Sequence, residues 1–464
     1  MPGTQKSTLD QFKGQKKVGS HPAYQEYKQT DHKCFEKIPQ EWETYKLKQI
    51  SGVFPSNVDK KEKEGEPSIR LCNYTEVYNN SEITADMDFM QATAKKSEIQ
   101  KFRLEKGDVI ITKDSESWDD IGVPSYVAQT MDDVICGYHL AHLKPYRSTI
   151  DGKYLYYFLE SEAGSYHFHI EANGVTRYGI STNGIKEAPV TVPPKGEQEA
   201  IVEFLDNETE KIDHLIEKKT KLIDLIEEKR TAMITDAVTQ GLDSDVGTKS
   251  SGVPGLGEIP EDWDLAPLKY SSRNITVGIV SKPSQYYVDD GVPALRSLNI
   301  KENKIVENEF VYISEEANKE LKGSQLHTGD LVSVRSGDPG TTAVVPEELD
   351  GANCIDLIII RKPDGYIPEF LSFLMNSEAS TSQIEAGTEG AAQQHFNVGE
   401  VKELVFPKPD LDEQKEILNW LSPRLKGMDE TEAKIREGIE RLKEYRTTLI
   451  TEAVTGQIDV RGEV

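Results

Sequence analysis

The sequence predicts an α+β protein made of two repeated mixed α/β domains, each followed by a long helix, with the two helices pairing as an antiparallel coiled coil. The first observation is a stretch at 197–243 whose apolar residues follow the 4-3 spacing of a narrow helical seam. The second is the return of that stretch at 413–459, displaced throughout by 216 positions (413 − 197). The third is that landmarks ahead of the first helix return ahead of the second. Together they indicate an internal duplication.

The chain divides in order into six segments. We expect an N-terminal arm (1–36), a first domain (37–195), a first helix (196–243), a linker (244–258), a second domain (259–408) and a second helix (409–464). The arm is polar and rich in lysine without a hydrophobic period, which predicts a mobile or loosely docked extension. The linker is rich in Ser, Gly and Thr, as is typical of loops.

Each domain is expected to combine short strands with a helix. The paired landmarks are Ile38-Pro39 and Ile259-Pro260, Trp42 and Trp263, Gly107-Asp108 and Gly329-Asp330, and Cys136 and Cys354. Their offset drifts between 218 (354 − 136) and 222 (329 − 107), as in one fold whose loops differ in length. Runs at 108–112, 330–334 and 355–361 are β-branched and predict strands. Runs at 154–159 and 368–375 predict helices.

The two long helices are the elements that the pattern defines best. Their candidate pairing and docking residues are Ile201, Leu205, Ile212, Leu215, Leu222, Ile226 and Met233 in the first helix, and Ile417, Leu421, Ile435, Leu442 and Leu449 in the second. Because both seams belong to one chain, we expect each helix to pair with the other one folded back antiparallel. Pro423 should kink or restart the second helix after its first turns.

Net charge, cysteine spacing and the length of apolar runs exclude some classes of protein but leave nucleic-acid binding undecided. The formal net charge is −26, which is unusual for a protein that binds nucleic acid. Two interpretations stay open: the chain does not touch nucleic acid, or acidic residues coat its outer surface, as in a halophilic source, while Lys and Arg gather on one face. Four cysteines without CxxC spacing favour a reducing compartment. With no long apolar run, we expect a cytoplasmic protein.

Catalytic and metal-binding motifs are not found in the sequence. No GxGxxG follows a predicted strand, and no GxxxxGK[ST] phosphate loop is present. Acidic residues at the start of the second helix are explained by the helix dipole. Cys136, His139 and His142 have the spacing of a metal motif, but we interpret them as a core cysteine and two surface histidines. We therefore predict no catalytic residue and no metal site in this chain.

Polar loops after the central strands are the candidate contact residues. Lys113 and Ser115 follow the first Gly-Asp strand, and Arg335, Ser336, Thr341 and Thr342 follow the second. Corresponding later segments add Arg177 and Tyr178, and Gln393, Gln394 and His395. These side chains suit phosphate positioning and hydrogen bonds to base edges. Ordinary surface turns are the alternative for any one of them. The two halves differ most in these loops, as expected of a protein that reads a bipartite target.

The doubled order of motifs resembles the specificity (S) subunits of type I restriction-modification enzymes. The resemblance covers about 38–460 and rests on three pairs of motifs: Ile-Pro-x-x-Trp from Ile38 and Ile259, Pro-x-x-x-Glu-Gln-x-x-Ile from Pro193 and Pro409, and Arg-Thr-x-x-Ile-Thr-x-Ala-Val-Thr from Arg230 and Arg446. It implies that each domain is a target recognition domain for one part of a split double-stranded DNA sequence. It also implies that the helices set the distance between the half-sites and dock two methyltransferase (M) subunits.

The resemblance assigns the chemistry to other chains. It implies that S-adenosylmethionine, ATP and magnesium belong to partner subunits, the M subunits and the restriction (R) subunits, and that this chain is non-catalytic. The acidity and the N-terminal arm are not explained by it. Two other functions remain open at this point: a coiled-coil scaffold that binds protein without DNA specificity, and a self-sufficient nuclease or methyltransferase, which would need a catalytic cluster that the sequence does not show.

Overall fold

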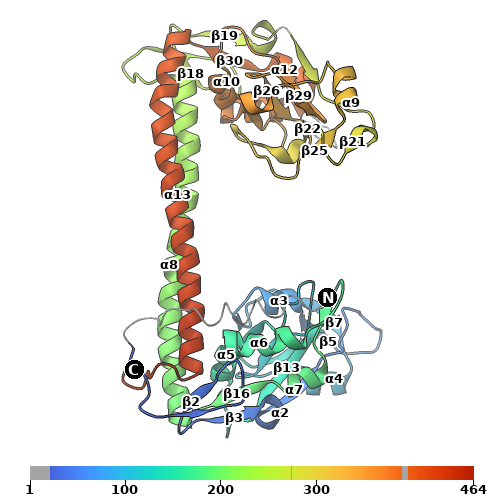
Figure 1. Ribbon diagram of the computed structural model, residues 1–464, viewed down its shortest axis with the longest axis vertical. Coiled ribbons are helices and arrows are strands. Elements are labelled where there is room, and N and C mark those ends of the chain that lie inside the picture. The colour runs from blue at the N-terminus through green and yellow to red at the C-terminus, as the bar shows by residue number, and fades with distance from the viewer. Residues whose placement is uncertain (1–20, 273, 389–395, 464) are drawn as a thin grey trace. The chain divides into compact units, whose positions relative to one another are not determined.

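The computed structural model describes residues 21–272, 274–388 and 396–463, and these fall into two compact units. Unit 1 holds the residues up to Lys219 and those from Arg436 onward, and unit 2 holds Thr220–Ile435. Each unit therefore contains one domain together with one part of each long helix. These helices are α8 (Lys195–Gln240) and α13 (Leu411–Val454), and both are continuous (Figure 1). Within the described residues, no helix is both long and apolar enough to cross a membrane.

In the described part of unit 1, two mixed sheets carry the domain. The larger has the order β4 (Ser51–Pro55), β13 (Leu140–Pro145), β9 (Val109–Thr112), β11 (Pro124–Val127) and β6 (Glu82–Ile83). The smaller has the order β7 (Met90–Thr93), β5 (Ser68–Cys72), β12 (Met131–Cys136) and β8 (Arg103–Leu104). The helices are α2 (Leu47–Ile50), α3 (Tyr74–Tyr78), α4 (Lys96–Phe102), α5 (Gly152–Glu160), α6 (Glu162–Glu171) and α7 (Thr182–Lys186).

Unit 2 repeats this plan with shorter elements. One sheet has the order β20 (Ile275–Val277), β29 (Leu357–Ile360), β26 (Leu331–Val334) and β27 (Thr342–Val344). The other has the order β21 (Tyr287–Val288), β25 (Val311–Ile313), β22 (Val292–Leu295) and β28 (Asn353–Cys354). A further pair is β23 (Ile300–Lys301) with β24 (Lys304–Ile305). The helices are α9 (Glu315–Glu320), α10 (Pro368–Met375), α11 (Glu378–Thr388) and α12 (Val398–Glu403).

The predicted central strands and helices are confirmed, and the local sequence explains them. β9 and β26 are entirely buried and rich in β-branched residues, so they occupy interior positions in their sheets. Asp151 caps α5 by accepting from the backbone N–H groups of Lys153 and Tyr154. Pro368 begins α10, where its missing N–H leaves no bond unmade.

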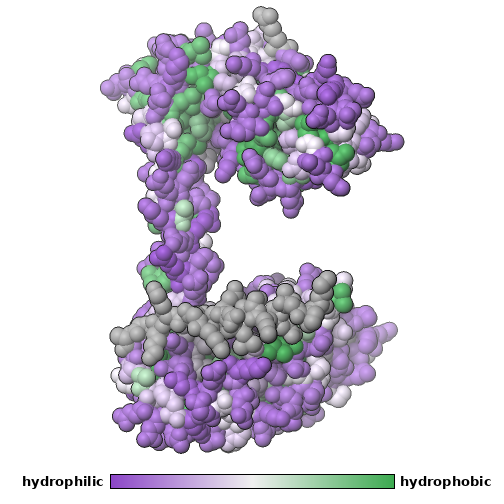
Figure 2. All heavy atoms as spheres, viewed as in Figure 1, coloured by the Kyte–Doolittle hydropathy of each residue, from purple (hydrophilic) through white to green (hydrophobic). Residues whose placement is uncertain are grey.

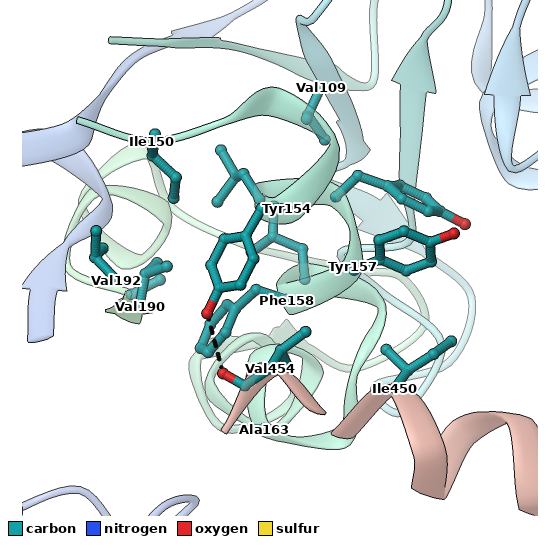
Figure 3. Packing of buried hydrophobic residues seen from close by; sticks show 14 of the residues in the cluster. Val109, Ile150, Tyr154, Tyr157, Phe158, Ala163, Val190, Val192, Ile450 and Val454 are labelled. Atoms are coloured by element: carbon teal, nitrogen blue, oxygen red, sulfur yellow. Dashed lines mark hydrogen bonds between the residues drawn. The ribbon is translucent and has the colours of Figure 1, made fainter. Parts of the chain in front are cut away.

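The core of unit 1 joins its domain to both helices. In Figure 3, Tyr154 of α5 points toward Val454 near the end of α13, and its hydroxyl donates to the Val454 carbonyl at 3.1 Å. Ile201, Leu205 and Leu449 are buried in the same cluster. In unit 2, the other end of α8 packs with the start of α13 and the second domain. The early part of each helix thus packs against the late part of the other, so the predicted antiparallel pairing is confirmed.

The repeated Glu-Gln motif at the helix starts has a structural explanation. Gln198 is fully buried, and its side-chain amide donates to the carbonyls of Thr149 (3.1 Å) and Pro193 (2.8 Å). Its carbonyl oxygen accepts from the Asp151 N–H at 2.7 Å. Gln414 makes the same three bonds in unit 2, with the partners displaced by the same 216 positions: Gly365, Pro409 and Ile367. This glutamine fastens each helix to its domain.

The N-terminal arm and the linker are more ordered than the sequence predicts. β1 (Tyr27–Gln29) pairs with β2 (Lys37–Pro39), and β17 (Thr248–Ser250) pairs with β18 (Glu258–Pro260) in the same register, 221 positions later (248 − 27). Tyr24 and Phe35 are buried in the core of unit 1, and Leu256 in that of unit 2. The prediction of a loosely docked arm is therefore wrong for residues 21–36. Residues 1–20 lie outside the described part of the chain.

The helical seam differs from the predicted one at two positions. Leu215 and Leu222 are 47% and 46% exposed, whereas Ile223 is buried and Ile216 packs against the core of unit 1. The prediction that these two leucines lie in the seam is wrong, because the spacing from Ile212 continues by four residues rather than three. Pro423 lies inside the continuous helix α13, so the helix does not restart there.

The edges of each domain are closed by equivalent strand pairs. These are β3 (Glu43–Lys46) with β16 (Pro189–Val192), and β19 (Asp264–Pro267) with β30 (Val405–Lys408). Each pair leads directly from the domain into its long helix. The two halves are thus the same framework down to their closing strands.

Candidate nucleic-acid interface

A small three-stranded sheet collects the predicted contact residues of the first half. β10 (Asp114–Ser115) pairs with β15 (Tyr178–Gly179), which pairs with β14 (Asn173–Gly174). Ser115 lies opposite Tyr178 in the register. The backbone N–H of Ile180 donates to the carbonyl of Lys113 at 2.9 Å. The fold therefore brings Lys113 and Ser115 beside the segment that carries Arg177 and Tyr178.

The turn between β12 and β13, which lie in different sheets, adds Tyr138, which the sequence did not identify, and His139, which the sequence suggested only as a surface histidine. The Lys113 ammonium lies 4.9 Å from the ring centroid of Tyr138, within the range of a cation–π contact. His139 Nδ1 lies 2.7 Å from Asp114 Oδ2, and Arg177 Nη2 lies 3.4 Å from the same ring nitrogen. His139 adopts a left-handed backbone conformation with φ of 74°. The β12–β13 turn thus connects the two polar segments into one cluster that includes basic and aromatic side chains.

The exposure of these residues separates accessible groups from supporting ones. Arg177 and Tyr138 are exposed, whereas Ser115 is buried and its hydroxyl accepts from the Ser117 N–H. On the neighbouring helix α3, the Tyr78 hydroxyl donates to Asp120 at 2.7 Å, and this bond raises the pKa of Tyr78 to about 12. The single hydroxyl proton of Tyr78 is thus already donated to Asp120.

The second half has the same framework with different side chains at the tip. Arg335 corresponds to Lys113 (335 − 113 = 222), and Asp356 corresponds to Tyr138 (356 − 138 = 218). Arg335 Nη1 lies 2.5 Å from Asp356 Oδ1, and Asp356 is also left-handed, with φ of 51°. The Phe396 N–H donates to the Arg335 carbonyl at 3.1 Å, as Ile180 does to Lys113. In each half, a cation at the end of the central strand thus lies against an adjacent turn, between β12 and β13 in unit 1 and between β28 and β29 in unit 2.

The remaining candidates of the second half are only partly accessible. Thr342 is fully buried, and its hydroxyl donates to the Gly340 carbonyl at 2.7 Å. Thr342 therefore supports the loop from inside, as the buried Ser115 does in the first half, and a DNA contact by either side chain stays a prediction. Ser336 and Thr341 are half-buried. The other candidates in this half, Gln393, Gln394 and His395, lie outside the described residues.

His142 lies in the core of the first domain rather than on its surface. His142 is fully buried, with Nε2 at 2.7 Å from Asp108 Oδ2, so the interpretation of a surface histidine is wrong. Burial lowers the pKa of His142, although the bond to Asp108 opposes this effect. Cys136 is also buried, and burial raises the pKa of its thiol. In the described part of the chain, no group of three or more His, Cys, Asp or Glu side chains is arranged to hold a metal ion.

Comparisons with known proteins match both halves. A family model described as the type I restriction modification DNA specificity domain matches residues 39–225 and 291–441, and the two matches end at equivalent positions (441 − 225 = 216). The putative type I restriction enzyme MjaX specificity subunit of Methanocaldococcus jannaschii is 28% identical over 449 residues, which are 94% of this chain and 98% of that protein. The EcoBI specificity subunit of Escherichia coli is 23% identical over 300 residues, 62% of this chain and 63% of that protein.

A solved structure has the same fold. It comes from a study of complex assembly and conformational transition of a type I R-M system, and it superposes with a TM-score of 0.68 at 15% identity. The match covers 91% of this chain and 99% of that chain. At this identity the likeness concerns the fold, including the two domains and the two long helices.

Proposed function

The chain belongs to the type I restriction-modification DNA specificity family and is a DNA-recognition subunit, and we propose that each of its halves reads one part of a divided target. The observation that carries the proposal is the pair of equivalent loop clusters on one framework. Lys113, Tyr138 and His139 stand in one half where Arg335 and Asp356 stand in the other. Two copies of a framework with different side chains at the tip suit two different base sequences.

The long helices supply the second part of the proposal. α8 and α13 set the separation of the two half-sites and dock two methyltransferase subunits, with the restriction subunits joining that complex. In support, the two helices pair through buried seams within each unit and are fastened to their domains by Gln198 and Gln414. S-adenosylmethionine, ATP and magnesium are then bound by the partner subunits, and this chain contributes recognition.

A domain exchange tests the two-reader proposal. Residues 259–408 are replaced by the corresponding stretch of a relative with another target, and the DNA sequence selected by the full complex is determined from a random duplex library. We expect one half of the selected sequence to change and the other half to stay. If both halves change, the proposal is wrong. If the unchanged protein retains no sequence at all at any salt concentration, the chain is a scaffold rather than a DNA reader.

A helix extension tests the role of the helices separately. One heptad is inserted into α8 between 210 and 230, with the equivalent heptad inserted into α13 to keep the seams paired. Seven residues lengthen a helix by about 10 Å, which corresponds to about three base pairs. We expect the spacer of the selected sequence to widen while both half-sites stay the same. An unchanged spacer would contradict this role of the helices.

A further inference from the structure

Residues 173–179 form a narrow hairpin that ends in an exposed loop. Asn173 pairs with Gly179 and Gly174 with Tyr178, which leaves Val175, Thr176 and Arg177 as the loop. A Cβ on Gly174 would lie 2.0 Å from the Arg177 carbonyl oxygen, so this tight loop requires glycine. Gly174 thus indicates a close backbone turn at this position rather than an ordinary surface loop.

The tip of the hairpin carries an unusual side chain. Val175 is 90% exposed, the largest value among the large hydrophobic side chains of the described residues. Hydrophilic residues dominate the face of the molecule drawn in Figure 2. Covering an exposed apolar side chain with a partner removes its surface from water, which stabilises the complex.

The hairpin is held in place by its neighbours. β15 pairs with β10 as well as with β14, and Ile180, directly after β15, is buried. The Arg177 guanidinium lies against the ring of His139, at 3.4 Å from Nδ1 and 3.5 Å from Nε2. Asp114 fixes that ring through its 2.7 Å bond to Nδ1. The loop therefore presents Val175 and Arg177 from a supported base.

The chemistry of the tip matches a base-pair edge. A two-stranded β-ribbon fits the DNA major groove, where the C5-methyl group of thymine is the apolar group on the base edges and guanine offers two acceptors that suit arginine. Lys113, next to the hairpin, lies 3.9 Å from the Asp114 carboxylate and over the Tyr138 ring, and this cation can also face the phosphate backbone. The neighbouring exposed carboxylate of Glu116 suits a cytosine amino group rather than a phosphate.

We propose that the β14–β15 hairpin is the base-reading element of the first half, with Val175 contacting a thymine methyl group and Arg177 donating to an adjacent base edge. His139 acts as a positioning residue for Arg177. This inference rests on the proposed function and names the residues of its first half-site.

The test removes the methyl group of a thymine from the DNA and the two γ-methyl groups of Val175 from the protein. The target selected by the wild-type full chain, assembled with the methyltransferase subunits of its own system, is synthesised with deoxyuridine in place of each thymine in turn. At one thymine of one half-site, we expect wild-type affinity to fall about fourfold, since a single apolar carbon is lost. Val175→Ala should bind the thymine and deoxyuridine duplexes equally. Arg177→Ala should lose roughly five- to 150-fold in discrimination at a neighbouring base pair.

The controls separate this inference from the proposed function. Val246→Ala changes an exposed valine away from the hairpin and should keep the wild-type response to deoxyuridine. If Val175→Ala also keeps that response, or if Arg177→Ala weakens all sequences equally, the hairpin does not read bases and this inference is overturned while the two-reader proposal stands. If the wild-type protein selects no sequence, the proposed function fails as well. Because Val175 is almost fully exposed, its truncation should not affect folding.

Discussion

The substitution Gln198→Leu should loosen the first unit without affecting the second. The buried Gln198 amide donates to the Thr149 and Pro193 carbonyls and accepts from the Asp151 N–H, at 3.1, 2.8 and 2.7 Å. Leucine has a similar volume and no polar atom, so all three bonds are lost and three backbone groups are left unpaired. A buried hydrogen bond contributes about 1 kcal/mol, and the change should therefore cost about 3 kcal/mol. The matched substitution Gln414→Leu should cost unit 2 a similar amount.

Hydrogen exchange followed by mass spectrometry reads the two units separately. In Gln198→Leu, exchange of the α5 amides should accelerate roughly 150-fold, which is 3 kcal/mol expressed as a ratio, while the α10 amides keep the wild-type rate. Gln414→Leu should show the reverse. Gln100→Leu, at an exposed position of α4, is the control and should change neither set. An acceleration below about fivefold in α5, or equal acceleration in both units, would refute the reasoning.

Three further predictions concern the packing and the titration of the protein. Burial lowers the folded-state pKa of His142, so the unfolded chain binds more protons than the folded chain below about pH 6.5. The free energy of unfolding should therefore fall by up to about 1.4 kcal/mol per pH unit as the pH drops below about 6.5. His142→Gln should flatten this slope in denaturant titrations. Ile223→Ala should destabilise by about 2 kcal/mol in thermal unfolding and Leu222→Ala by less than about 0.5 kcal/mol; similar costs would contradict the assigned seam. Arg446→Ala breaks two ion pairs in a mostly buried setting and should lower the free energy of unfolding by about 2 kcal/mol. Arg230→Ala should lower it by less than about 1 kcal/mol. The reverse order in urea unfolding would show that burial does not govern the strength of these pairs.

The sequence predicts the framework well because repetition is visible without knowledge of contacts. The helix starts at 195 and 411 differ by the same 216 positions that relate the Glu-Gln motifs, and the central strands follow their Gly-Asp pairs. The role of Gln198 was not predictable, since its partners Thr149 and Asp151 lie 49 and 47 positions away. A buried amide leaves no periodic signal.

The errors have physical causes of the same kind. The arm has a polar composition, yet Tyr24 and Phe35 are buried, and the Tyr24 hydroxyl donates to Glu197 at the start of α8. Burial of these two aromatic side chains holds the arm against the domain, although most residues of the arm are polar. In the seam, Leu215 and Ile216 are adjacent apolar residues, and only packing decides which of them faces the partner helix.

The candidate site was predictable in its segments but not in its geometry. Lys113 and Arg177 were identified because polar loops follow strands. Their connection through His139 depends on a turn between two sheets that lies 26 positions from one and 38 from the other (139 − 113 and 177 − 139). The left-handed conformation of His139 also has no signal in the sequence, because glycine, the usual residue there, is absent.

Two ion pairs between described residues of α8 and α13 have a consequence for symmetry. Arg230 pairs with Asp429 in unit 2, and Arg446 pairs with Asp213 in unit 1. These are one contact made twice, because 446 − 230 and 429 − 213 both equal 216. Each helix carries an aspartate in its first half and an arginine in its second, so its surface is complementary to an antiparallel copy of itself. Such a surface is isologous and suits a two-fold dimer of half-length chains. Fusion of two such chains needs no new contact in the interface and replaces a concentration-dependent association by an intramolecular one.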